Sequence, residues 1–134
     1  MSYGNEFHKN KVIEEGKKHF GNNFIPLMDF MEYTAYIELL KKVDIAVFNH
    51  NRQQAMGNIL TLLGLGKKVY IKKGIATWTV VNEKNLVVKE IDEANGLGEL
   101  ETLLTEEEIL QNKKNVLENF SLEMCVKAWK DVFK

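Results

Sequence analysis

The stretch that decides the fold is residues 43–71, VDIAVFNHNRQQAMGNILTLLGLGKKVYI. It opens with an apolar run of strand length, residues 43–48, and closes with a second run, residues 69–71, that follows Gly64 and Gly66. Apolar residues at helical spacing lie between the two runs: Met56, Ile59, Leu60, Leu62 and Leu63. A strand, a helix and a strand in this order predict a parallel βαβ crossover.

The turn between the first strand and the helix carries six successive side chains with amide, imidazole or guanidinium groups: Asn49, His50, Asn51, Arg52, Gln53 and Gln54. They have far more hydrogen-bonding capacity than a turn needs. The carboxyl end of a strand followed by the amino end of a helix favours an anion, because backbone N–H groups and a positive dipole end meet there. Open α/β sheets bind ligands at this edge. The turn therefore predicts a ligand site.

The chemistry of this turn suits a phosphorylated sugar compound. The planar fork of Arg52 can bind phosphate through two parallel hydrogen bonds, and Asn and Gln amides can bind sugar hydroxyls or a base edge. Gly57, just inside the helix, would let a phosphate approach the backbone. A simpler interpretation is that Asn49 and Asn51 cap the helix, His50 packs, and Arg52 is solvated. Six such side chains together favour a site.

The segment DIAVFNHNRQQAMGNILTLLGLGKKVYI, residues 44–71, closely resembles the carboxy-terminal domain of bacterial TDP-N-acetylfucosamine:lipid II N-acetylfucosaminyltransferases, the 4-α-L-fucosyltransferase family. The core NHNRQQ-x-x-GN is its most specific part. Supporting matches are SYGN at residues 2–5, FIPLMDFMEYTAYIELLKKVDIA at residues 24–46, and Thr77 with Trp78. The resemblance covers about residues 1–90, and the last third matches mainly in its helical pattern.

The resemblance implies an α/β fold, a Rossmann-like α/β/α sandwich with a parallel sheet, as the carboxy-terminal half of a GT-B glycosyltransferase. It implies transfer of 4-acetamido-4,6-dideoxygalactose (Fuc4NAc), or a related sugar, from a TDP-sugar donor to a polyprenyl-diphosphate-linked glycan. Such a reaction builds bacterial surface polysaccharide of the enterobacterial common antigen type. It would take place on the cytoplasmic face of the inner membrane, where the full-length protein is expected to be peripheral.

The donor-binding residues that the resemblance implies are Ser2, Tyr3, Gly4, Asn49, His50, Asn51, Arg52, Gln53, Gln54, Gly57, Asn58, Thr61, Thr77 and Trp78. Many GT-B enzymes carry a ribose-binding glutamate where this chain has Thr61, so we expect Asn58 or Gln54 to share that contact. Trp78 can stack on thymine or fill the core. The loop at residues 2–4 lies near the donor or is a disordered terminus.

Catalysis of this kind is similar to that of metal-independent enzymes, in which a helix dipole and side-chain donors stabilise the departing diphosphate. Arg52 and the backbone near Gly57 would fill this role, and His50 suits a donor to the diphosphate or sugar. No cofactor is expected. The catalytic base would come from another domain, so none is assigned in this chain.

The length of 134 residues predicts one domain that folds without disulfides or metals, and the resemblance implies that it is the donor-binding domain. Because a GT-B enzyme needs two domains, the resemblance implies a fragment without the amino-terminal acceptor domain. The loop at residues 2–5 has no apolar strand before it, which predicts that the first strand is missing. The fragment is expected to bind donor weakly and to be inactive.

Composition describes a soluble globular protein, with 45% hydrophobic residues, 28% charged residues and a net charge of −1, which argues against a nucleic-acid partner. Without an apolar run of membrane-spanning length or a signal pattern, we expect a cytoplasmic protein. The single Cys125 excludes an internal disulfide and is predicted to be a small buried hydrophobe. The three histidines show no metal-ligand spacing, so no metal is predicted.

Outside the central unit, the pattern predicts helices at residues 5–20 and 31–42, a turn or short helix at residues 77–81, and short strands at residues 23–27 and 86–88. The resemblance instead implies a loop at residues 23–27. The first helix would bury Phe7, Val12, Ile13 and Phe20. A loop at residues 92–101 leads to two closing helices, one starting at a capping box of Thr105 and Glu108 and one from Ser121. Trp129 and Phe133 on the last helix would be exposed if another domain normally covers them.

Four lysines bracket the second strand of the central unit: Lys67, Lys68, Lys72 and Lys73. They either keep the strand ends solvated or contact lipid phosphates, so contact with a membrane surface stays open.

Two other protein classes share parts of this pattern. A flavodoxin-like or receiver-like domain also alternates strands and helices, but it should place paired acids at a strand end, and Asp44 precedes its strand instead. A pure protein-interaction module would leave the six polar side chains unexplained. The discriminating property is ligand choice, because only the transferase domain would prefer TDP.

Overall fold

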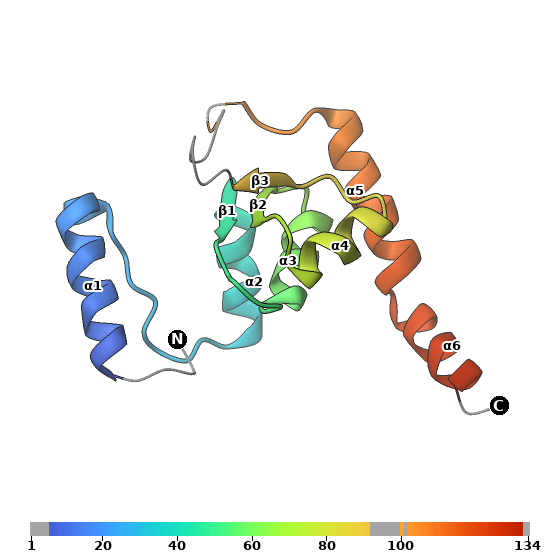
Figure 1. Ribbon diagram of the computed structural model, residues 1–134, viewed down its shortest axis with the longest axis horizontal. Helices are drawn as coiled ribbons and strands as arrows, with labels where there is room; N and C mark the ends of the chain where they lie inside the picture. Colours follow the sequence, from blue (N-terminus) through green and yellow to red (C-terminus); the bar gives the residue numbers. More distant parts are fainter. Residues whose placement is uncertain (1–5, 92–99, 101, 133–134) are drawn as a thin grey trace. The chain divides into compact units, whose positions relative to one another are not determined.

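The computed structural model describes residues 6–91, 100 and 102–132, and the chain divides into two compact units, Met1–Ile37 and Glu38–Lys134 (Figure 1). Predictions for Ser2, Tyr3, Gly4, Phe133 and most of the loop at residues 92–101 lie outside the described residues. That the chain forms a single donor-binding domain stays a prediction.

The second unit is built on a parallel sheet with the strand order β1-β2-β3. Its strands are β1 (Ile45–Phe48), β2 (Lys68–Lys72) and β3 (Lys89–Ile91). Helix α3 (Met56–Gly64) connects β1 to β2, and α4 (Ala76–Glu83) connects β2 to β3 (Figure 1). Both helices pack on β2. The predicted α/β class and the βαβ crossover are confirmed.

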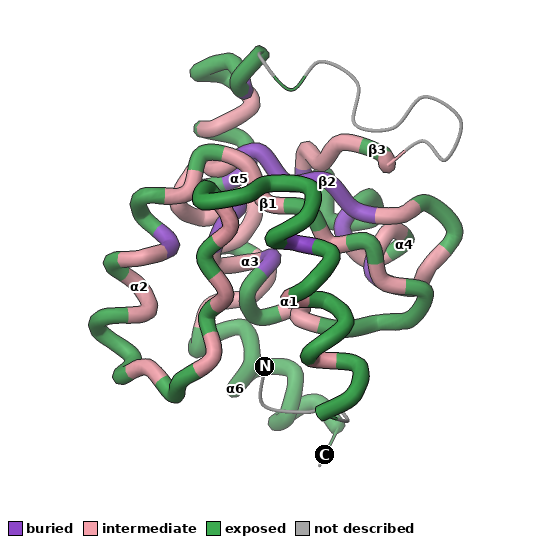
Figure 2. The backbone as a smooth tube through the Cα atoms, turned by 90° about the vertical axis from the view of Figure 1, so that its left-hand side faces the viewer, coloured by how far each residue is buried: buried purple, intermediate pink, exposed green. Residues whose placement is uncertain are grey.

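The core of this unit gathers around β2, the middle strand. Figure 2 shows its backbone as buried, and Val69, Tyr70 and Ile71 are at most 2% exposed. Ile59, Leu62 and Leu63 of α3 and Val81 of α4 are buried as well. Burying an aliphatic side chain of this size contributes about 1.5–3 kcal/mol. The apolar residues whose spacing predicts α3 thus form the face of the helix that packs on the sheet.

The turn from α3 into β2 depends on Gly66, whose φ is +77°. Its N–H donates to the Leu63 carbonyl at 3.0 Å, and the next N–H, of Lys67, donates to the Leu62 carbonyl at 2.9 Å. A Cβ atom at position 66 would lie 2.8 Å from Cγ2 of Ile109. Glycine is needed here both for the left-handed backbone and for the close approach of the Ile109 side chain.

The strand predicted at residues 86–88 is wrong, because β3 begins at Lys89, beside Tyr70 of β2. Asn112, a fully buried residue of α5 (Glu106–Phe120), binds the backbone of Val87 instead. Its Oδ1 accepts from the Val87 N–H at 2.6 Å, and its Nδ2 donates to the Val87 carbonyl at 3.0 Å. One side chain therefore satisfies the two groups that a neighbouring strand would otherwise pair.

Helix α5 begins at the predicted capping box, which is confirmed. The Glu108 N–H donates to Oγ1 of Thr105 at 3.2 Å, and the Thr105 N–H donates to Oε2 of Glu108 at 2.8 Å. The bond from the Thr105 N–H, with a second from Lys89 Nζ at 3.1 Å, lowers the pKa of Glu108. The charged carboxylate thus stabilises the start of the helix.

The last described helix, α6 (Leu122–Val132), follows α5 and contains no buried residue. Cys125 is exposed, so its predicted burial is wrong. Leu122, Trp129 and Val132 are exposed too. The apolar spacing predicted an amphipathic helix correctly, but periodicity does not show whether another element covers the apolar stripe. No described helix is both long enough and apolar enough to cross a bilayer.

The first unit contains α1 (Glu6–Phe20) and the short 3-10 helix η1 (Gly21–Asn23), and α2 (Tyr33–Lys42) begins at its end. No strand forms at residues 23–27, so that prediction is wrong. The ring of Phe24 packs on Gly16, where a Cβ atom would lie 2.4 Å away.

Most of the predicted core of α1 is wrong as well. Phe7 and Phe20 are 77% and 65% exposed, Val12 is exposed and Ile13 is half-buried. Gly16 is the one buried residue of α1. Within this unit the ring of Phe24 therefore packs on α1 at Gly16, the one residue of the helix that is buried.

Candidate functional site

The polar turn, residues 49–54, lies at the carboxyl edge of the sheet, where β1 and β2 both end. In the parallel register Phe48, the last residue of β1, pairs with Ile71 of β2. The next residue, Lys72, ends β2 and its Nζ donates to Oδ1 of Asn51 at 2.9 Å. This bond connects the ends of two neighbouring strands at the edge where α/β folds bind ligands.

Arg52 is the only arginine of the chain and is exposed. When the Gln54 amide is oriented with its oxygen toward Arg52, Nε and Nη2 of the guanidinium both donate to that oxygen at 3.0 Å. A guanidinium has five N–H donors, so the others remain for a ligand. Gln54 thus orients the charged fork from within the turn.

His50 is half-buried and packs edge-on against Phe48, with ring centroids 5.8 Å apart and an interplanar angle of 66°. The packing contact of the simpler interpretation is present. Phe48 belongs to β1, so this contact ties the imidazole to the end of the strand.

The capping contact of the simpler interpretation is absent. The N-cap residue of α3 is Ala55, which has φ 56° and ψ 25° and makes no side-chain cap bond, so neither Asn49 nor Asn51 caps this helix. A left-handed alanine costs roughly 1–2 kcal/mol. A Cβ atom built at Gly57 meets nothing within 4 Å. The backbone at Gly57, in the first turn of α3, therefore has open space beside it, and the N-cap residue supplies no side-chain acceptor.

Two predicted residues further along α3 differ in their contacts. Asn58 is exposed, as is Gln53 in the turn. The Thr61 hydroxyl donates to the Gly57 carbonyl at 2.8 Å, within the helix. Its single proton is used in this bond, so Thr61 can only accept a hydrogen bond from a ribose hydroxyl.

Thr77 and Trp78 stand at the start of α4, beyond the carboxyl end of β2. Thr77 is fully buried, and its Oγ1 has no hydrogen-bond partner among the described residues. Trp78 is half-buried. These two residues share the carboxyl edge of the sheet with the polar turn.

The lysines at the ends of β2 have different environments. Lys68 is 3% exposed, donates from Nζ to the Thr102 carbonyl at 2.6 Å, and lies 5.1 Å from the centroid of the Tyr70 ring. The suggested lipid contact is therefore wrong for Lys68. Lys67 donates to the Lys41 carbonyl at 2.7 Å, and Lys73 pairs with Glu90 at 3.3 Å.

Lys72 is the residue that sequence reasoning missed at the site. The sequence presents it as one of four lysines that bracket a strand, whereas its hydrogen bond to Asn51 places it beside the polar turn. The sequence contains one signal that could have found it. The parallel pairing of residues 45–48 with residues 68–71 would bring the residue after Ile71 next to the turn.

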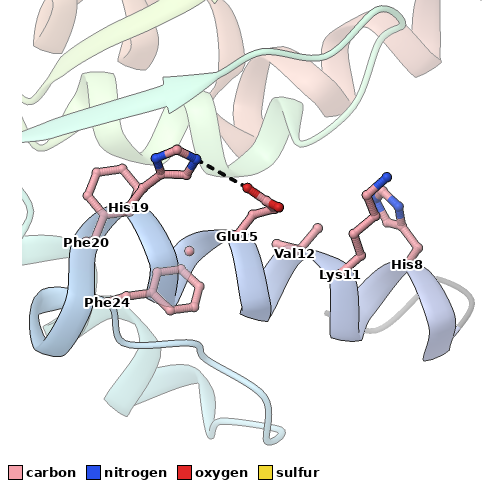
Figure 3. A pocket seen from close by; sticks show the side chains of 8 residues that line it. His8, Lys11, Val12, Glu15, His19, Phe20 and Phe24 are labelled. Atoms are coloured by element: carbon pink, nitrogen blue, oxygen red, sulfur yellow. Dashed lines mark ion pairs between the residues drawn. The ribbon is translucent and has the colours of Figure 1, made fainter.

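Two hollows lined by described residues lie away from the polar turn. A groove of about 440 Å³ runs along α1 in the first unit, where Val12, Phe20 and Phe24 line it beside the Glu15–His19 ion pair (Figure 3). A second, of about 460 Å³, is lined by Leu60, Phe120 and Met124 among others. Neither includes a residue of the polar turn. The described residues contain no group of three His, Cys, Asp or Glu that could hold a metal ion.

Residues 1–134 match a family described as 4-alpha-L-fucosyltransferase glycosyl transferase group 56. The match extends over the last third of the chain, where the resemblance seen in the sequence rests mainly on helical pattern. No solved structure matches the chain.

Proposed function

Because the chain belongs to the 4-alpha-L-fucosyltransferase family of glycosyltransferases, we propose that its polar turn binds the diphosphate of a nucleotide-sugar donor. A glycosyltransferase needs such a donor and an acceptor. The family match favours this function over the flavodoxin-like or receiver-like alternative. The proposed donor site comprises the polar turn, the first turn of α3 with Gly57 and Asn58, and the residues Thr61, Thr77 and Trp78.

The observation that carries the proposal is the uncapped start of α3 beside Arg52. The N-cap residue Ala55 supplies no side-chain acceptor, and the backbone at Gly57 is open. The N-terminus of a helix carries roughly half a positive elementary charge, which favours a phosphate. Arg52, held by Gln54, adds a full charge at the same turn.

In the proposed reaction an acceptor hydroxyl oxygen attacks C1 of the donor sugar and forms the new glycosidic bond. The bond from C1 to the diphosphate oxygen breaks, and its electron pair stays on the departing diphosphate. Arg52 and the N–H groups of α3 stabilise this growing negative charge, which is the main task in such catalysis. The acceptor proton passes to a base, which we assign to a separate acceptor-binding domain of a GT-B enzyme. No divalent metal ion is required in this scheme.

The finer parts of the proposal rest on the resemblance of the NHNRQQ-x-x-GN core. We propose a TDP-linked donor that carries 4-acetamido-4,6-dideoxygalactose or a related sugar. The proposed acceptor is a polyprenyl-diphosphate-linked glycan at the cytoplasmic face of the inner membrane. The polyprenyl chain of such an acceptor is apolar and its diphosphate-linked glycan is polar. The enzyme would therefore work at a membrane surface.

Calorimetric titration of the chain with TDP and with UDP tests this function. We expect TDP to bind more tightly than UDP, and Arg52→Ala to weaken TDP binding about tenfold or more, because charge-assisted hydrogen bonds are lost. Lys84→Ala is a matched control, since Lys84 is an exposed cation at the end of α4. A folded wild-type chain that binds neither nucleotide would contradict the proposal.

A further inference from the structure

We propose that Lys72 is part of the donor site, where it positions Asn51 and supplies a second positive charge to the diphosphate. This inference rests on the proposed function. The polar turn follows β1, whereas Lys72 ends β2. The proposed site is therefore formed at the ends of two strands and not by one loop alone.

The position of Lys72 in the sheet supports this role. β2 is the middle strand, so its carboxyl end has the polar turn on one side and the end of β3 on the other. Lys72 is the last residue of β2 and is half-buried. Its stem is therefore partly covered, while its ammonium group reaches Asn51. A cation at this point lies at the carboxyl edge where a ligand of a parallel sheet binds.

The bond to Asn51 also orients the amide of that residue. Oδ1 accepts from Lys72 Nζ at 2.9 Å, so the two N–H donors of the Asn51 amide point away from the ammonium. The ammonium also carries a full positive charge, which attracts phosphate oxygens close to it. The point charge of Lys72 and the planar fork of Arg52 bind phosphate in different ways, so the two cations complement each other.

The other lysines at the ends of β2 bind elsewhere in the described structure. Lys73, the next residue, pairs with Glu90 at 3.3 Å, and both side chains are well exposed. Lys68 is buried over Tyr70. Lys73 therefore provides a matched control, because it has the same charge and is adjacent in sequence, yet its ion pair lies on the β3 side.

The test compares TDP affinity of the wild-type chain with that of Lys72→Met, Lys72→Arg and Lys73→Met. We expect Lys72→Met to weaken TDP binding about tenfold or more, because a charged hydrogen bond is lost. Lys73→Met should change TDP affinity by less than about twofold. Lys72→Arg keeps the charge and should recover part of the affinity. A double variant with Asn51→Ala should lose less than the product of the two single losses, because the residues act as a pair.

A second measurement needs no variant. The side-chain amide signals of Asn51 in a ¹⁵N-labelled wild-type chain should shift on TDP addition, since the amide that Lys72 orients faces the ligand. The role of Lys72 is overturned, and the proposed function is not, if Arg52→Ala weakens TDP binding, Lys72→Met leaves it unchanged, and the Asn51 signals do not shift on TDP addition. A folded wild-type chain without TDP binding overturns this role and the proposed function together.

Discussion

Replacing Asn112 with alanine is expected to destabilise the second unit strongly, although Asn112 lies outside the proposed donor site. Asn112 is a fully buried polar residue whose amide binds both backbone groups of Val87, at 2.6 and 3.0 Å. Alanine removes both partners and leaves a donor and an acceptor of the backbone unpaired. The effect should therefore exceed that of an ordinary polar substitution on a helix surface.

The magnitude follows from these two bonds. An unsatisfied buried donor or acceptor costs about 1–3 kcal/mol, which gives about 2–6 kcal/mol for the pair. Val87 is half-buried, so water can reach part of its backbone, and we expect about 2–4 kcal/mol. With a urea m-value of about 2 kcal/mol/M, the unfolding midpoint should fall by about 1–2 M.

Urea unfolding followed by tryptophan fluorescence measures this change, because Trp78 and Trp129 both belong to the second unit. Asn115→Ala is the matched control. Asn115 lies one turn along α5, and its Nδ2 donates to the Asn85 carbonyl at 2.8 Å, an acceptor that Gln111 also binds. The control should cost less than about 1 kcal/mol. Equal, small losses for both variants would refute the assignment of Asn112 as the partner of Val87.

Other substitutions test the capping box and two glycines. Because the pKa of Glu108 is lowered in the folded chain, its stabilisation is present above its ordinary pKa and disappears as pH falls through the lowered value. When the pH is lowered from about 6 to about 3, the urea midpoint of Glu108→Gln should therefore fall less than that of wild type. Equal falls of the two midpoints would argue against this. Gly66→Ala should cost about 1 kcal/mol or more, because φ is +77° and Cγ2 of Ile109 lies 2.8 Å from the added Cβ, and an unchanged midpoint would contradict that geometry. Gly57→Ala should instead raise stability by about 0.5–1 kcal/mol while weakening TDP binding, since the added Cβ meets nothing within 4 Å but occupies the proposed phosphate approach. Unchanged TDP affinity in a more stable Gly57→Ala chain would place the phosphate elsewhere.

The central unit could be predicted from sequence because its signals are local. The apolar runs before Asn49 and after Lys68, the helical spacing between them and Gly66 all act over a few residues, and they give β1, α3 and β2 within about two residues. The capping box at Thr105 is local too, since its two bonds join residues three apart. Local signals of this kind need no knowledge of the rest of the fold.

The errors have in common that they depend on distant partners. The apolar run predicts a strand at Val87, and nothing near it in sequence indicates that Asn112 binds its backbone. The pattern predicts a strand at Phe24 as well, but its ring packs on Gly16 of α1. Cys125 has the spacing of a buried residue on a helix whose apolar stripe is exposed in the described structure. Amphipathic spacing identifies a face without showing whether anything covers it.

The same reasoning explains which parts of the candidate site could be predicted. The polar turn is a contiguous run between a strand and a helix, so the sequence alone indicates it. Lys72 was missed because it reaches Asn51 only through the pairing of β1 with β2. The αL conformation of Ala55, which leaves α3 without a side-chain cap, has no recognisable signal either, since alanine rarely adopts it.

The central claim is that the carboxyl edge of the sheet binds the donor, and amide chemical-shift mapping with TDP tests it most directly. The prediction is that the largest shifts fall on the polar turn, on Gly57 and Asn58, and on Lys72. Shifts confined to the groove along α1, or to the groove beside Phe120 and Met124, would contradict the account.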